Sequence, residues 1–191
     1  QRGRFTAETV MLLDQARLTH PIATPTAQFG LELVVSNTLS VDPTSTIDVS
    51  GRGYLGGRVS GNGDVGRTLG NTAVGGSARR SGGSYGGLGA SGSGDPVVNA
   101  VYGDYANPNE LGSGGGSDSN GGGNGGGLVR ITADLLVLEG QILANGGNGG
   151  YWGGGGSGGG IKLQVNTLSG TGAVRANGGT GGSGAGGGGG G

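Results

Sequence analysis

An internal repeat of 32 residues is the sequence feature that most limits how this chain can fold. Residues 126–150 and 158–182 align without a gap, and both copies contain Ala-Asn-Gly-Gly near their ends. The aligned pairs are Val129 with Ile161, Ile131 with Leu163, Ala133 with Val165, Leu136 with Leu168, Ile142 with Val174, and Asn145 with Asn177. A repeat of this length is typical of proteins that stack one supersecondary unit on the next.

Two less regular copies precede these. Leu31, Leu33 and Val35 begin one copy, in which three extra residues around Pro43 lengthen the connection between its apolar runs. Alternating apolar residues near Phe5 form a weaker copy at the start of the chain. Residues 7–18 also have the pattern of a short amphipathic helix, so an N-terminal helical cap is an alternative for this segment.

Within each copy the apolar residues alternate, which places them on one face of a β-strand. Two short strands per copy predict an all-β fold, namely a parallel β-solenoid (a right-handed β-helix) with Gly-rich loops and one long insertion. Ile131, Leu163, Ile142 and Val174 are expected to be buried in stacked pairs. The predicted organisation is an N-terminal coil or cap (1–29), a first clear coil (30–57), a Gly- and Asn-rich insertion (58–127) and two further coils (128–191).

Glycine supplies 55 of the 191 residues, and only 31% of the residues are hydrophobic. An ordinary globular domain has about 45–50% apolar residues when glycine is included, so a core of packed helices is excluded. Long glycine runs follow the second predicted strand of each of the last two copies. Three interpretations stay open for them: flexible linkers, tight bends between stacked coils, or extended polyglycine helices joined through their backbones.

The composition argues against several classes of function. Eleven basic and twelve acidic residues are scattered along the chain, which does not favour a nucleic-acid partner. The longest apolar runs are too short for membrane insertion. Cysteine is absent, and the one histidine, His20, precedes a proline and is expected to be exposed. We therefore predict no catalytic residues and no enzyme activity.

Calcium is the one cofactor that the residues suggest. Asp104, Glu110 and Asp118 offer carboxylate oxygens beside glycine loops whose carbonyls are further hard ligands. The stretches 61–64 and 92–95, which end in Asp64 and Asp95, each match half of a calcium-binding nonapeptide, although they are not in tandem. A solvated polar loop is the simpler interpretation of these acids.

Three tyrosines make the 58–127 segment the best candidate for ligand binding. Tyr85, Tyr102 and Tyr105 supply most of its aromatic surface, and surface glycans are the ligands considered. Asp104 and Glu110 are the only acid pair near them, so a carbohydrate-binding or polysaccharide-processing module is the alternative function. An ice-binding protein is a weaker alternative, because the outward positions carry no regular array of threonine and the glycine runs lack a strict three-residue period.

Residues 111–116, 122–147 and 154–179, which combine glycine runs with alternating apolar strands, resemble the glycine-rich parallel β-helix repeats of large secreted and surface-exposed proteins, especially bacterial adhesins. The resemblance implies an extracellular or cell-surface location and a structural or adhesive role. It implies neighbouring coils, or copies of the same or a parent protein, as partners. The sequence stops where a further coil is expected to begin, which predicts a segment of a longer assembly or fibre.

Overall fold

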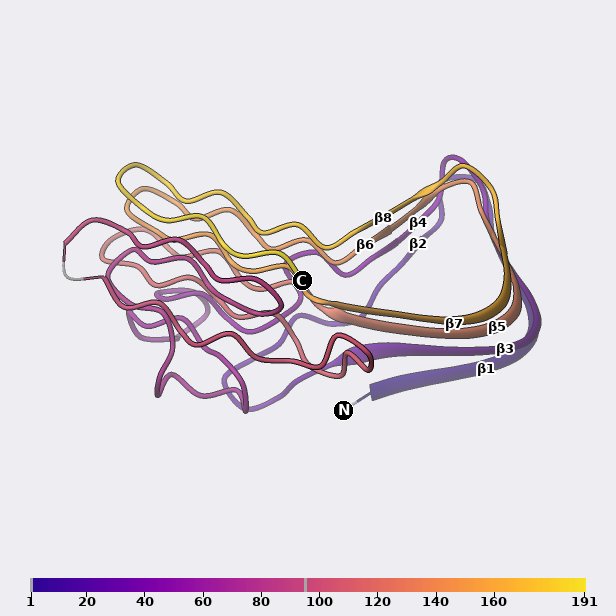
Figure 1. The fold of residues 1–191 in the computed structure, drawn as a ribbon, viewed down its shortest axis with the longest axis horizontal. Coiled ribbons are helices and arrows are strands. Elements are labelled where there is room, and N and C mark those ends of the chain that lie inside the picture. Colours follow the sequence, from indigo (N-terminus) through magenta and orange to yellow (C-terminus); the bar gives the residue numbers. More distant parts are fainter. Residues whose placement is uncertain (1, 95) are drawn as a thin grey trace.

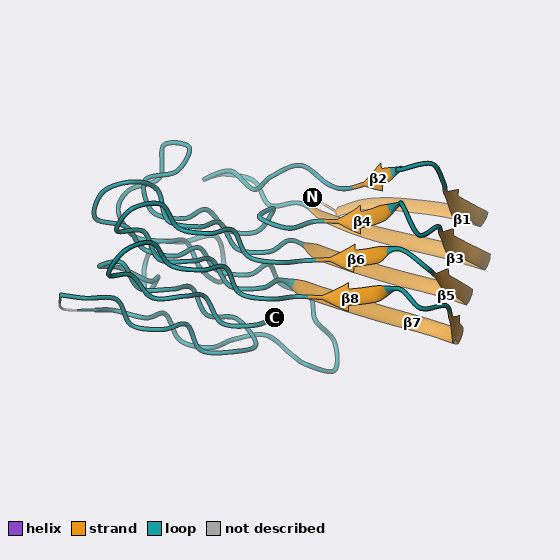
Figure 2. Ribbon diagram, turned by 90° about the horizontal axis from the view of Figure 1, so that it is seen from above, coloured by secondary structure: helices purple, strands orange, loops and turns teal. Residues whose placement is uncertain are grey.

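The structure, a computed structural model, describes residues 2–94 and 96–191. These residues contain strands and no helix, and the strands lie in two parallel sheets (Figure 2). The first sheet has the order β1 (Arg2–Leu12), β3 (Gly30–Val41), β5 (Leu128–Leu138) and β7 (Gly160–Ser169). The second has the order β2 (Arg17–Leu18), β4 (Thr46–Asp48), β6 (Gln141–Leu143) and β8 (Ala173–Arg175).

Strand pairing follows the repeat. β5 pairs with β7 so that Ile131 lies opposite Leu163, and β6 pairs with β8 so that Ile142 lies opposite Val174. The opening segment takes the equivalent place on β3, with Phe5 opposite Leu33. A strand therefore forms where a helical cap was the alternative, because its alternating side chains fit the pleat of the neighbouring strand.

The predicted β-solenoid is wrong, although the fold is all-β. The long and short strands form two separate sheets, and the chain that leaves each short strand does not complete a coil. After β4, β6 and β8 it runs away from the sheets as Gly-rich segments and returns (Figure 1), whereas residues 19–29, which follow β2, contain no glycine. These segments bond laterally to one another in both parallel and antiparallel directions. Because that bonding satisfies their backbone groups outside the sheets, no continuous winding is formed.

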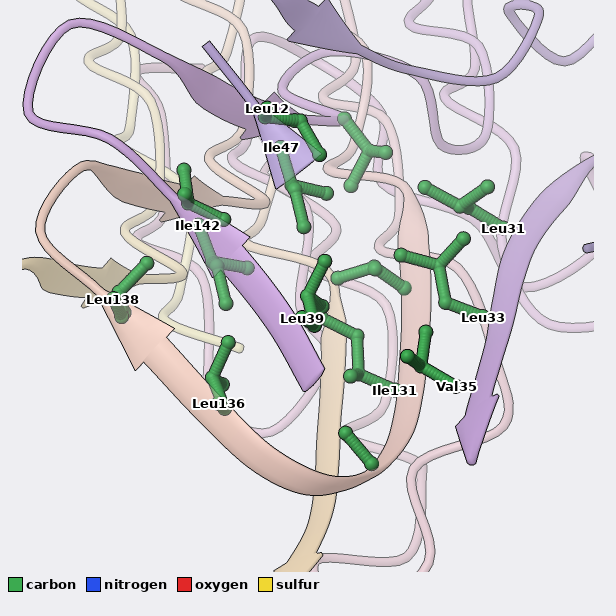
Figure 3. Packing of buried hydrophobic residues seen from close by; sticks show 14 of the residues in the cluster. Leu12, Leu31, Leu33, Val35, Leu39, Ile47, Ile131, Leu136, Leu138 and Ile142 are labelled. Atoms are coloured by element: carbon green, nitrogen blue, oxygen red, sulfur yellow. The ribbon is translucent and has the colours of Figure 1, made fainter. Parts of the chain in front are cut away.

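The apolar core lies between the two sheets (Figure 3). Ile131 and Ile142 are 1% and 0% exposed, as their alternation predicts. Their partners differ from the expectation: Leu163 is only partly buried and Val174 is 44% exposed. The reason is position, because β7 and β8 are the last strands of their sheets, and within the described residues no further strand covers them.

Asparagines stack at the ends of the short strands, as the repeat predicts. The Asn177 amide donates to the side-chain oxygen of Asn145 (2.9 Å), and the Asn145 amide donates to the Ser50 hydroxyl (3.1 Å). Further along, the Thr180 amide donates to the Asn148 side chain (2.9 Å). These bonds tie successive repeats together where the chain leaves the sheets.

The Gly-rich segments pack side by side into a unit that we call the glycine bundle (residues 51–57, 80–92, 111–127, 144–160 and 176–191). Its central segment, 153–160, is buried along its whole length. From Gly153 to Gly159, amides three residues apart donate to the same neighbour: Gly153, Gly156 and Gly159 to residues 144–150, Gly154 and Ser157 to 111–117, and Gly155 and Gly158 to 185–191. Three residues per turn without internal hydrogen bonds is the geometry of a polyproline II-type helix.

Three more segments (80–83, 121–127 and 176–182) donate to carbonyls of the central segment, so six neighbours surround it. A Cβ atom placed on Gly156 would lie 2.0 Å from the carbonyl oxygen of Asn124. At Gly156 the interior therefore admits backbone only, whereas the small side chain of Ser157 fits inside and accepts a hydrogen bond from the Ser113 amide (2.8 Å). Outer segments need glycine only where they face inward, which explains why the sequence lacks a strict three-residue glycine period.

Candidate functional site

A cavity of about 580 Å³ lies at the β7–β8 end of the sheets, beneath the loop 101–108. Its wall includes Tyr85, Tyr102, Asp104 and Tyr105 from the predicted ligand-binding region, together with Ile161, Val174 and Gly191 from the end of the chain. Sequence reasoning placed the tyrosines on a binding face, and the structure brings all three to this one cavity. Whether they bind a ligand stays a prediction.

The three tyrosines differ in their surroundings. Tyr85 and Tyr102 pack edge to face, with ring centroids 5.1 Å apart, and Tyr85 is 3% exposed. The Tyr102 hydroxyl donates to the Leu111 carbonyl (2.5 Å), and burial raises the pKa of this hydroxyl well above its usual value. Tyr105, in contrast, is fully exposed. Tyr85 and Tyr102 thus support the loop, and Tyr105 is the ring available to a ligand.

The three calcium candidates lie apart. Asp104 accepts hydrogen bonds from the Ala106 and Asn107 amides of its own turn, at 2.8 and 3.3 Å. Glu110 lines a different cavity, of about 590 Å³, next to residues 26–30. Asp118 forms an ion pair with Arg80, its Oδ2 lying 2.9 Å from the Arg80 Nε. Among the described residues, no group of three or more acids or histidines is placed to hold a metal ion.

Of the two half-motifs for calcium, the one that is fully described adds no ligand group. Asp64 forms an ion pair with Arg58 (2.8 Å), and Asp95 lies outside the described residues. Asp104 and Glu110 also fail to face each other across one cleft, as a pair of acids for glycoside hydrolysis requires, because they line separate cavities.

His20 is buried, with 5% exposure, contrary to the expectation that it is exposed. Its Nδ1 lies 2.7 Å from the Pro21 carbonyl oxygen, and its Nε2 is buried without a hydrogen-bond partner. A Cβ atom on Gly127 would lie 2.4 Å from that Nε2, so the imidazole fills the space that this glycine leaves. Burial lowers the pKa of His20 below its usual value, which keeps the ring neutral at pH 7.

Asn99 is a structural centre that sequence reasoning missed. It is 1% exposed, and its side-chain oxygen accepts from the Ser77 hydroxyl (2.8 Å) and the Ser84 amide (2.7 Å). Its amide nitrogen lies within donor distance of Thr68 and Ser113 (both 3.1 Å). Asn99 therefore fixes the base of the loop that carries Tyr102 and Tyr105. Nothing in the local sequence distinguishes it from the other asparagines.

A cluster of aromatic and charged side chains, which the sequence did not indicate, surrounds the turn between residues 150 and 153. The Tyr151 and Trp152 rings stack at 26° with centroids 4.9 Å apart. The Arg80 guanidinium carbon lies 4.3 Å from the Trp152 ring centroid. The turn joins segments that run out from β6 and back to β7, so it lies at the end of the glycine bundle away from the sheets (Figure 1).

Both ends of the sheets are open. At the first end is an apolar hollow of about 270 Å³ lined by Phe5, Val10, Leu12, Ala16, Arg17, Leu18, Leu31 and Leu33. At the other end the loop 101–108 covers the side nearest the glycine bundle, while Leu168 remains 57% exposed. Edge strands of this length and composition are surfaces on which another strand can pair.

No known protein family, curated protein or solved structure matches this chain. The described residues contain no helix that is long and apolar enough to cross a membrane. The fold defines the class of protein: an all-β chain in which two parallel sheets carry a bundle of hydrogen-bonded glycine segments.

Proposed function

We propose that this chain is an extracellular structural or adhesion module that belongs to a larger surface protein or fibre. The observation that carries the proposal is the pair of open sheet ends, each with inward apolar side chains that no described strand covers. The extracellular location rests on the glycine-rich repeat pattern.

Stacking of copies explains both ends at once. If β7 of one copy pairs with β1 of the next in the register used inside the chain, Leu163 faces Phe5 and Leu168 faces Val10. Leu168 then covers apolar surface at the hollow of the next copy, and both edges gain a partner. Because this contact joins the tail of one copy to the head of the next, it can repeat without closing into a ring and so builds a filament.

One column of charges makes this register testable. Along the outward face, Arg4 lies opposite Glu32, Glu32 opposite Arg130, and Arg130 opposite Lys162. In the stacked assembly, Lys162 of one copy lies opposite Arg4 of the next. Like charges directly opposite each other weaken pairing, whereas opposite charges strengthen it by about 0.2–1 kcal/mol.

The Lys162→Glu variant is therefore expected to associate about tenfold more strongly at low salt, because a repulsive pair becomes attractive. Sedimentation velocity across a concentration series measures the change. Adding Arg4→Glu to this variant restores repulsion and should reverse the gain. High salt should reduce all these differences, since it screens exposed charges. A chain that stays monomeric at every concentration, with either variant, contradicts the stacking.

A carbohydrate-binding module is the second candidate. The observation that favours it is the cavity of about 580 Å³ beside Tyr105, whose ring is fully exposed while Tyr85 and Tyr102 hold the wall in place. An exposed aromatic ring beside a cavity suits the apolar face of a sugar. Loss of glycan binding on Tyr105→Ala would assign binding to this cavity.

A further inference from the structure

Two equivalent turns of the repeat differ in a way that local stability does not explain. The Gly153 amide donates to the Gly150 carbonyl (2.8 Å), and 32 residues later the Ala185 amide donates to the Gly182 carbonyl (3.0 Å). Both turns have a positive φ at their third residue. The later turn has Gly184 there, at φ 65°, whereas the earlier turn has Trp152, at φ 56°.

Left-handed backbone is unfavourable for a residue with a Cβ atom, and glycine avoids this cost. The turn at Gly184 is thus the relaxed form of the turn at Trp152. Exposed stacking and cation–π contacts of the kind that Trp152 makes stabilise a fold by an amount similar to that cost, so they offset the strain without a clear surplus. Strained residues of this type are concentrated at sites of function.

The cluster is also fixed and exposed, as a binding site requires. Tyr151 and Trp152 are 54% and 37% exposed. The Asn120 amide donates to the Tyr151 carbonyl (3.2 Å), and the Asp118 amide donates to the Trp152 carbonyl (3.3 Å). Arg80 pairs with Asp118 and donates through Nη1 to the Ser93 hydroxyl (2.9 Å), so its position is set before any ligand arrives.

We propose that Tyr151, Trp152 and Arg80 form a binding site for a neutral glycan. An aromatic face matches the apolar C–H face of a sugar ring, and the guanidinium and carboxylate beside it match the hydroxyl groups at the ring edge. Because Arg80 and Asp118 neutralise each other, the cluster does not favour a charged ligand. Two partly exposed rings are also far smaller than the roughly 800 Å² per partner of a stable protein interface.

Trp152 is the only tryptophan of the chain, so tryptophan fluorescence, excited selectively over the five tyrosines, reports on this site alone. The probes are neutral hexasaccharides of glucose, mannose and N-acetylglucosamine. We expect at least one of them to shift the Trp152 emission with a saturable dependence on concentration. Tyr151→Ala should weaken that binding at least tenfold. Val74→Ala, which shortens an exposed side chain outside both candidate glycan sites, should leave it unchanged.

Trp152→Gly separates a binding role from a structural one. We expect this variant, followed by calorimetry, to lose glycan binding while unfolding at the same or a higher temperature, since its turn then matches the one at Gly184. A clearly lower unfolding temperature would identify the aromatic pair as a structural cap and overturn the proposal. Failure of all three glycans to bind, or loss of binding in Tyr105→Ala alone, would also overturn it. None of these three results affects the stacking of copies, which sedimentation tests independently.

Discussion

Gly156→Ala is expected to destabilise the folded protein by about 3 kcal/mol or more, which is the upper part of the range for overpacked interiors. The new methyl group would lie 2.0 Å from the Asn124 carbonyl oxygen and 2.8 Å from the Gly125 amide nitrogen. Both atoms belong to the backbone, so no side chain can rotate away. Relief requires that neighbouring segments move apart, which breaks their hydrogen bonds. Thermal and urea unfolding, followed by circular dichroism, measure the loss.

Gly63→Ala is the matched control. Gly63 is exposed, and a Cβ atom on it would meet nothing within 4 Å. We expect this variant to unfold within about 1 kcal/mol of the parent, because the added methyl group only reduces the freedom of the unfolded chain. Equal stability of the two variants would contradict the close packing of the central segment.

Leu136→Ala is expected to cost about 2–5 kcal/mol, the usual range for a fully buried leucine. Leu136 is 0% exposed, and its side chain lies between the two sheets. The lost stability includes the free energy of transferring the leucine side chain out of water and the cost of the cavity left behind. The cavity stays open because strands on either side of β5 hold the surrounding residues in place. Equilibrium unfolding in urea gives the difference in free energy.

Leu168 provides the comparison, because it occupies the same position of the repeat and pairs directly with Leu136. It is 57% exposed, so Leu168→Ala should cost less than about 1 kcal/mol in the isolated chain. At concentrations where copies stack, the same substitution should weaken association, because Leu168 then becomes an inner position. Equal losses for both leucines in dilute solution would mean that the last repeat is already covered.

The strands could be predicted from the sequence because their side chains carry the information. Alternation at Ile131 and Ile142 specifies which face is buried, and the spacing of the repeat specifies the partners Leu163 and Val174. The stack of Asn145 on Asn177 follows from the same register. The prediction of a closed winding was wrong, because side chains do not indicate how the glycine runs that connect one repeat to the next are hydrogen-bonded.

The glycine bundle and the candidate sites were harder to predict, for a physical reason. The bundle is held together mainly by hydrogen bonds between backbone groups, which are the same in every residue. The sequence therefore shows that glycine is frequent there, but it does not show which segments pair. The surroundings of Asn99 and the approach of Arg80 to Trp152 depend on how distant segments meet. The sequence contains one signal for the Trp152 cluster, which is that the next repeat has Gly184 at the position of Trp152. This difference becomes informative only once the structure shows that both residues have a positive φ.

The glycine bundle also determines how the stability of this protein depends on temperature. The heat capacity of unfolding rises with newly exposed apolar surface and falls with newly exposed peptide groups. The central segment 153–160 buries amides and carbonyls in place of apolar side chains. Its unfolding therefore contributes far less than the about 12–15 cal/mol/K per residue of an ordinary domain. The free energy of unfolding then varies gently with temperature, and cooling removes little of it.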